Sequence, residues 1–234
     1  MSRVLIDIGN TRLKWRAGDA AAVAWHAHDG DPVTALRTLP ALAGAEVLIA
    51  QVMGATTRDA LRAAAAAAGA SAVRFADTEA ERDGLRIAYD DPARLGVDRF
   101  LAMLALWREL RGPFLVASAG TALTVDIVDA EGRHLGGYIA PGLHAMRSAV
   151  LDRTRFPHAF DAPADGRPGT STEGCVAEAA LAASLGLLER CRRDHDGPAF
   201  LSGGDAATLL PHLDPTAWQT REHVVLDGLA ALDA

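Results

Sequence analysis

The order of apolar and polar positions predicts strands and helices in an arrangement that occurs twice along the chain. Residues 4–8 and 13–15 predict two strands around a turn at Gly9-Asn10. Residues 114–121 begin the same pattern again, with a turn at Gly120 and a return strand over residues 124–128. Apolar strings followed by Gly and Thr are common in α/β proteins, but the two turns lie about half a chain apart. The pattern therefore indicates an internal repeat with two halves, residues 1–112 and 113–234.

Further strands and helices alternate within each half. Asp31-Pro32 is typical of a helix start, with an N-cap followed by proline. The predicted helices are 57–68, 99–111, 172–193 and 224–232, and the remaining predicted strands are 46–52, 72–75, 135–139 and 199–201. Residues 77–91 and 162–171 are expected to be irregular. This alternation predicts an α/β fold, two halves with a cleft between them.

Composition and charge narrow the functional classes. The 234 residues are 50% hydrophobic, which excludes a disordered chain and is enough for a large core. The formal charge is −7 and there is no basic run, so nucleic acid and anionic membranes are not expected partners. Two cysteines give no disulfide framework, and no segment resembles a signal peptide or a bilayer span. We therefore expect a cytoplasmic protein.

The two glycine turns are candidate phosphate sites. A tight glycine turn exposes backbone N–H groups that can bind phosphate oxygens, and Asn10, Thr11 and Thr121 would add side-chain donors. Asp7 precedes the first turn and could hold Mg²⁺. Gly203-Gly204 after a predicted strand offers a third turn of this kind. One such turn is weak evidence, whereas two related turns could clamp a polyphosphate.

Asp98 is a candidate general base. It lies at or just before a predicted helix start, where an N-cap is the structural alternative. Arg99 could bind a phosphate or an acidic substrate, or form a surface ion pair. His26 and His28 lie on one side of a possible strand with a spacing compatible with a metal ion, but no third ligand is near in the sequence.

Four motifs occur in the order seen in type III pantothenate kinases, and the match extends from the first strand to Ser202-Gly203-Gly204-Asp205, nearly the whole chain. They are Asp7-Ile8-Gly9-Asn10-Thr11, Gly96-Val97-Asp98-Arg99, the segment from Gly120 to Asp126 and the segment from Gly136 to Gly142. The chain resembles this family, including its Bvg accessory factor branch. The resemblance implies an actin-like ATPase fold with two ribonuclease-H-like halves, and a homodimer. It also implies phosphorylation of pantothenate by ATP with Mg²⁺, giving 4′-phosphopantothenate, the first step of coenzyme A synthesis.

The resemblance assigns roles to individual residues. Asp98 matches the catalytic base, and Asp7 is the expected Mg²⁺ ligand. The expected ATP-binding residues are Asp7, Ile8, Gly9, Asn10, Thr11, Arg12, Leu13, Lys14 and Thr121. The expected pantothenate-binding residues are Tyr89, Gly96, Val97, Asp98, Arg99 and Thr172. Lys14 is also the only lysine in the chain.

Two positions depart from the family pattern. Ser118 stands where the family usually has an Asp that binds a monovalent cation such as K⁺ or NH₄⁺. A hydroxyl is a poorer cation ligand than a carboxylate, although Ser also occurs in the Bvg accessory factor branch. Ile87 stands where relatives often carry Asn, which puts one pantothenate contact in question.

Two alternatives stay open, and Ser118 motivates the first of them. One is a regulatory or binding protein on the same fold with little catalysis. The other is an actin-fold kinase for another small hydroxy compound, which the fold alone does not separate from a pantothenate kinase.

Overall fold

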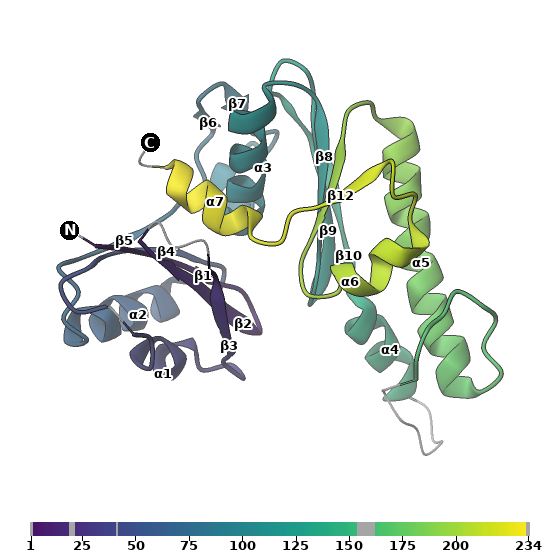
Figure 1. Ribbon diagram of the computed structural model, residues 1–234, viewed down its shortest axis with the longest axis horizontal. Helices are drawn as coiled ribbons and strands as arrows, with labels where there is room; N and C mark the ends of the chain where they lie inside the picture. Colours follow the sequence, from purple (N-terminus) through teal and green to yellow (C-terminus); the bar gives the residue numbers. More distant parts are fainter. Residues whose placement is uncertain (1, 19–21, 41, 154–161, 233–234) are drawn as a thin grey trace. The chain divides into compact units, whose positions relative to one another are not determined.

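The computed structural model describes residues 2–18, 22–40, 42–153 and 162–232, which divide into two α/β units. The first unit contains the chain up to Leu110 together with the segment from His223 onward, and the second runs from Arg111 to Glu222. Each unit has a sheet of five strands with helices packed on it (Figure 1). Among the helices of these described residues, none has the length and apolar character that a bilayer span requires.

The sheet of the first unit has the order β3-β2-β1-β4-β5. Strands β1, β2 and β3 are antiparallel neighbours, whereas β1, β4 and β5 are parallel. The strands are β1 Arg3–Ile8, β2 Arg12–Ala17, β3 Ala24–Ala27, β4 Glu46–Gln51 and β5 Ala72–Phe75. The helices are α1 Pro32–Arg37, α2 Ala55–Ala67, α3 Val97–Leu110 and α7 Val224–Ala231. A short hairpin of β6 Glu81–Arg82 and β7 Leu85–Arg86 and a 3₁₀ turn, η1 Pro92–Arg94, precede α3.

Strand β1 sends alternate side chains to two different helical layers. Val4, Ile6 and Ile8 belong to the core that includes residues of α1 and α2. Leu5 and Asp7 therefore lie on the opposite face, the side of α3 and α7 (Figure 1). This two-residue period directs Asp7 toward the same layer as the helix that carries Asp98.

The C-terminal helix α7 belongs to the first unit, so the predicted second half, residues 113–234, extends too far. Helix α7 packs against α3, where Gly228 comes so close that a Cβ atom there would lie 2.2 Å from the Leu101 carbonyl oxygen. Arg16 of β2 donates a hydrogen bond of 3.2 Å to Asp227. The apolar pattern of residues 224–232 predicted the helix, but such a pattern does not specify which apolar surface the helix covers.

The second unit repeats the strand order of the first, as β10-β9-β8-β11-β12. Its strands are β8 Phe114–Ala119, β9 Ala122–Val128, β10 His134–Pro141, β11 Ala199–Ser202 and β12 Trp218–Thr220. Its helices are α4 Leu143–Leu151, α5 Thr172–Asp194 and α6 Ala206–Leu209, followed by the 3₁₀ turn η2 Leu210–His212. The predicted repeat of a strand–turn–strand unit is confirmed, because β8 and β9 pair antiparallel as β1 and β2 do.

Several elements differ from their predicted form. Helix α4 and strand β12 were not predicted, since α4 follows directly on a strand and β12 has only three residues. The segment expected to be irregular before α3 contains the β6–β7 hairpin. This hairpin is held by Asp83, whose carbonyl accepts a hydrogen bond from Trp107 and whose carboxylate accepts one from Arg108. Contacts with α3, rather than a local pattern, stabilise it.

Candidate active site

The first glycine turn joins β1 to β2 and exposes polar side chains. The Gly9 N–H donates a hydrogen bond of 3.0 Å to the Arg12 carbonyl, which closes the turn. Asn10, Thr11 and Arg12 are exposed. Ile8 and Leu13 are fully buried in the core of the first unit, so only their backbone atoms are available to a ligand. We use the term phosphate loop for residues 9–11.

Asp7, Lys14 and Asp98 form one electrostatic group beside the phosphate loop. Asp7 and Lys14 lie directly opposite each other on β1 and β2, and they therefore share a face of the sheet. Burial raises the pKa of Asp7 from 3.8 to about 7, with the Lys14 charge lowering it and the Asp98 charge raising it further. Asp7 and Asp98, which are distant in the sequence, therefore lie near each other and near the Lys14 ammonium.

Asp98 is the second residue of α3 rather than its N-cap. The Arg99 and Phe100 amides both donate to the Gly96 carbonyl, so the helix is closed by the backbone of Gly96. The Asp98 carboxylate instead accepts from the Arg99 amide at 2.9 Å. A Cβ atom on Gly96 would lie 2.6 Å from that carboxylate oxygen, so glycine leaves room for the side chain of Asp98. Val97 is buried, which leaves its backbone as the part open to a substrate.

Arg99 and Tyr89 are brought into contact. The Arg99 guanidinium donates a hydrogen bond of 3.1 Å to the Tyr89 hydroxyl and lies 6.0 Å from the centre of its ring. Arg99 is only 7% exposed. A buried guanidinium held in this way is suited to bind a carboxylate. All the predicted site residues from Asp7 to Lys14, together with Tyr89 and the segment from Gly96 to Arg99, therefore belong to the first unit.

In the second unit three glycine turns meet at one end of the sheet. The Gly142 N–H donates to the Thr121 carbonyl, and a Cβ atom on Gly142 would lie 1.8 Å from the Gly120 carbonyl oxygen. Gly203 has a φ of +100°, and a Cβ atom there would lie 2.0 Å from the Ala119 carbonyl oxygen. The three turns are far apart in the sequence, and glycine at the end of a strand is the signal that they share.

Ser118 is the second-to-last residue of β8, and it is exposed. It pairs with Thr124 of β9 and with Ser202 of β11. Its neighbours in the sheet are thus hydroxyl residues rather than carboxylates. Thr121 is exposed in the turn that follows.

Thr172 is the first residue of α5. Ser171 caps this helix, accepting from the Gly174 amide at 3.0 Å, and Thr172 is exposed. Glu178 accepts from the Asp165 and Gly166 amides, which binds the preceding loop to the helix. Thr172, Thr121 and Ser118 are therefore positioned by the second unit.

Asp126, the last residue of the third motif, has a structural contact that the sequence did not suggest. It is buried and lies 3.0 Å from the His134 ring across β9 and β10. The register of these strands shifts between His134 and Gly136. The pair thus supports an irregular part of the sheet.

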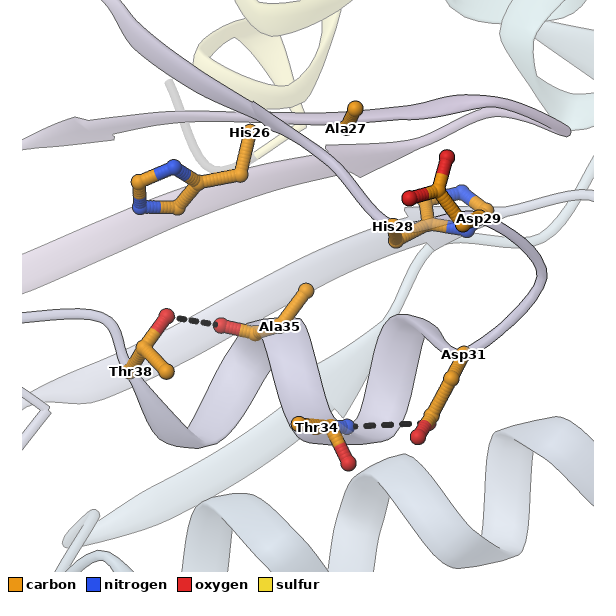
Figure 2. Close-up of a pocket in the computed structure, with 8 residues that line it drawn as sticks. All are labelled: His26, Ala27, His28, Asp29, Asp31, Thr34, Ala35 and Thr38. Atoms are coloured by element: carbon orange, nitrogen blue, oxygen red, sulfur yellow. Dashed lines mark hydrogen bonds between the residues drawn. The ribbon is translucent and has the colours of Figure 1, made fainter.

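His26 and His28 do not converge on a metal ion. The His26 ring packs on Trp15 at 4.8 Å, whereas the His28 ring bonds to the backbone. In Figure 2 the two rings point in different directions from the wall of a pocket of about 300 Å³. Within the described residues, no three His, Cys, Asp or Glu side chains are grouped so that they could hold a metal ion. The pocket is lined by His26, Ala27, His28, Asp29, Asp31, Thr34, Ala35 and Thr38.

Comparison with known proteins agrees with the geometry. The family model described as type III pantothenate kinase matches residues 3–194. The chain belongs to the type III pantothenate kinase family. A type III pantothenate kinase from Marinobacter nauticus is 38% identical, and the match covers 97% of this chain and 96% of that protein. One from Xanthomonas campestris pv. campestris is 40% identical, with 98% and 96% covered.

Solved structures that share the fold are much less similar in sequence. A Baf family protein from Campylobacter jejuni has a TM-score of 0.65 at 16% identity, with 98% of this chain and 96% of that chain covered. MreB5 of Spiroplasma citri has a TM-score of 0.54 at 11% identity, with 99% and 96% covered. These likenesses and the two five-stranded sheets confirm the predicted actin-like ATPase fold of this type III pantothenate kinase family member.

Proposed function

We propose that the chain phosphorylates pantothenate with ATP, the activity implied by its family. The observation that carries this proposal is the group of Asp7, Lys14 and Asp98 beside the phosphate loop. In this proposal the group would supply a base, a cation and a metal-binding carboxylate within one unit. Phosphoryl transfer depends mainly on positioning and charge neutralisation, and these side chains supply both.

In the proposed reaction the primary hydroxyl of pantothenate attacks the γ-phosphorus of ATP and ADP leaves. Asp98 accepts the hydroxyl proton, and its carboxylate is already oriented by the Arg99 amide. The phosphate loop and the turn at Thr121 bind phosphate oxygens through backbone and hydroxyl groups. Lys14 neutralises phosphate charge from the strand opposite Asp7.

The residues present fit a Mg²⁺ ion. Mg²⁺ usually takes one or two carboxylates together with water and phosphate oxygens. Asp7 is a half-buried carboxylate that can serve as such a ligand. Its pKa is raised, and a cation beside it would favour the ionised form. When bound, Mg²⁺ would neutralise charge that develops on the phosphates.

Arg99 and Tyr89 are proposed to bind the pantothenate carboxylate. Thr172 stays a predicted pantothenate-binding residue by resemblance to the family. The support in the first unit is the hydrogen bond that fixes the guanidinium. Because the guanidinium is buried, a carboxylate would bind to it more strongly than at the surface.

The deciding experiment measures ADP release with and without pantothenate. Release that requires pantothenate supports the proposal. ATP binding without such release would favour a regulatory protein, and release with a sugar or polyol instead would favour the alternative kinase.

Asp98→Asn should lower kcat by about two or more orders of magnitude with an unchanged melting temperature. Asp59→Asn, which removes an exposed carboxylate from α2, is the matched control and should leave kcat unchanged.

We further propose a homodimer in which a second copy covers the edge of the second sheet. Strand β10 is at that edge, where Leu135 is 55% and Ile139 is 66% exposed. Val150 of α4 is also half exposed. An exposed apolar edge strand favours association. Ile139→Lys should shift the molar mass measured by light scattering from two chains to one, whereas a mass unchanged by this substitution would contradict the proposed interface.

An enzyme of this kind is expected in the cytoplasm.

A further inference from the structure

One residue outside all four motifs holds both ends of the phosphate loop. His28 follows β3 and is 5% exposed. Its backbone N–H donates to the Thr11 carbonyl at 3.1 Å, and its Nε2 lies 2.9 Å from the Gly9 carbonyl oxygen. The carbonyls of the first and last residues of the loop therefore both bond to His28.

The hydrogen bonds of His28 determine its tautomer. A carbonyl oxygen only accepts, so the hydrogen must be on Nε2, which donates to Gly9. The Gly30 N–H donates to Nδ1 at 3.3 Å, so Nδ1 must carry no hydrogen. Asp29 and Gly30 both have positive φ, +44° and +88°, and this tight turn brings the Gly30 amide back to the ring. These contacts thus use one donor and one acceptor of the imidazole.

Holding the Gly9 carbonyl also orients the next amide. The chain has no cis peptide bond among its described residues, and in a trans peptide the C=O and the following N–H point in opposite directions. With the Gly9 carbonyl directed at His28, the Asn10 N–H is directed away from it. Asn10 is exposed, so a ligand can reach this part of the loop.

We propose that His28 is a positioning residue for ATP. Its imidazole holds the Gly9 carbonyl and so directs the Asn10 amide toward a phosphate oxygen of the nucleotide. The inference rests on the proposed role of the loop in ATP binding. A merely structural histidine would affect stability and both substrates alike, whereas a positioning residue affects ATP selectively.

Two substitutions at His28 distinguish its contact with the Gly9 carbonyl from its contact with the Gly30 amide. Asn can keep the acceptor for Gly30 but is too short to donate to Gly9, whereas the Gln amide can reach Gly9. His28→Asn should raise the KM and the dissociation constant for ATP about tenfold, and the KM for pantothenate less than about twofold. His28→Gln should restore ATP binding to within about threefold of wild type. His26→Asn is the matched control and should change neither constant, because His26 packs on Trp15 away from the loop.

Equal losses in the Asn and Gln variants, or equal rises in both KM values, would overturn the proposal. The ATP dissociation constant is measured by calorimetry without pantothenate. A wild-type chain that binds ATP but fails to turn over pantothenate would therefore refute the proposed function while still testing His28. If His28→Asn does not fold, the ¹⁵N shifts of the wild-type imidazole decide. Protonation on Nε2 alone, with an Asn10 amide shift on ATP addition, supports the proposal, and protonation on Nδ1 or an unmoved Asn10 amide overturns it.

Discussion

The Asp7 carboxylate is expected to lower the stability of the ligand-free fold, so replacing it should stabilise the protein while abolishing its activity. Asp7→Asn keeps the shape of the side chain and removes its charge. Burial raises the pKa of Asp7 from 3.8 to about 7, and the charge of Asp98 adds to this effect. At about 1.36 kcal/mol per pKa unit, this rise corresponds to roughly 4 kcal/mol. Local relaxation and water entry reduce such costs, and we expect about 2 kcal/mol in the free energy of unfolding.

The sign of the pH dependence follows from linkage. The raised pKa means that the folded state binds more protons than the unfolded state between about pH 4 and pH 7. The stability of wild type relative to Asp7→Asn is therefore greatest below about pH 4 and falls as the pH rises toward 7. Above about pH 7 Asp7 is ionised in both the folded and the unfolded protein, so the stability difference between wild type and Asp7→Asn stays constant.

Urea unfolding of both proteins at several pH values, without nucleotide or Mg²⁺, measures this difference. Tryptophan fluorescence can follow it, because Trp15 and Trp107 lie in the first unit. Asp77→Asn is a control of opposite sign, since a hydrogen bond from Arg58 holds the pKa of Asp77 below its usual value. That variant should be slightly less stable than wild type at pH 8, and the difference should disappear as the pH falls below about 4.

A stability difference between Asp7→Asn and wild type that does not change with pH would refute the reasoning, as would an Asp7→Asn protein less stable than wild type at pH 8. The same variant should lose ATP-dependent turnover by about two or more orders of magnitude, because the proposed Mg²⁺ ligand is gone. If Asp7→Asn is more stable and still turns over substrate normally, the stability argument holds but Asp7 has no role in catalysis.

Four further substitutions test other parts of the molecule. Lys14→Ala should raise the KM for ATP about tenfold and leave the KM for pantothenate nearly unchanged, since the ammonium faces Asp7 beside the phosphate loop; an unchanged ATP response would exclude the contact. ADP release by wild type should change less than about threefold when K⁺ is added to a buffer free of monovalent metal ions, and Ser118→Asp should increase that response, because a carboxylate binds a hard cation better than a hydroxyl does. Gly142→Ala should destabilise the second unit by about 2 kcal/mol or more, because its Cβ would lie 1.8 Å from the Gly120 carbonyl oxygen. Gly186→Ala on α5, where nothing lies within 4 Å, should instead stabilise by about 0.5–1 kcal/mol.

Much of the secondary structure could be predicted from the sequence, because it depends on neighbours along the chain. The strand over residues 72–75 and the start of α5 at Thr172 agree with their predicted positions. Asp31 caps α1 as expected, accepting from the Thr34 amide (Figure 2). The repeated strand–turn–strand unit was also predictable, since turn glycines and period-two apolar runs are local patterns.

The composition of the site could be only partly predicted. The motifs named Asp7, Asp98 and Arg99, but sequence alone did not indicate that Asp7 has a raised pKa, or that Arg99 is buried against Tyr89. The pKa depends on desolvation and on charges that are distant in the sequence. His28 suggested a metal ligand by its spacing from His26, whereas the fold uses both of its ring nitrogens for the backbone.

The sequence by itself determined where strands and turns occur and which residue types are available for phosphate chemistry, because periodicity and turn propensity act over a few residues. Only the tertiary structure decided that α7 packs on α3 of the first unit, and that Gly142 and Gly203 pack against the carbonyls of Gly120 and Ala119. These contacts depend on which apolar faces meet and how closely two backbones approach. Both are properties of the folded packing, and no local pattern along the chain encodes them.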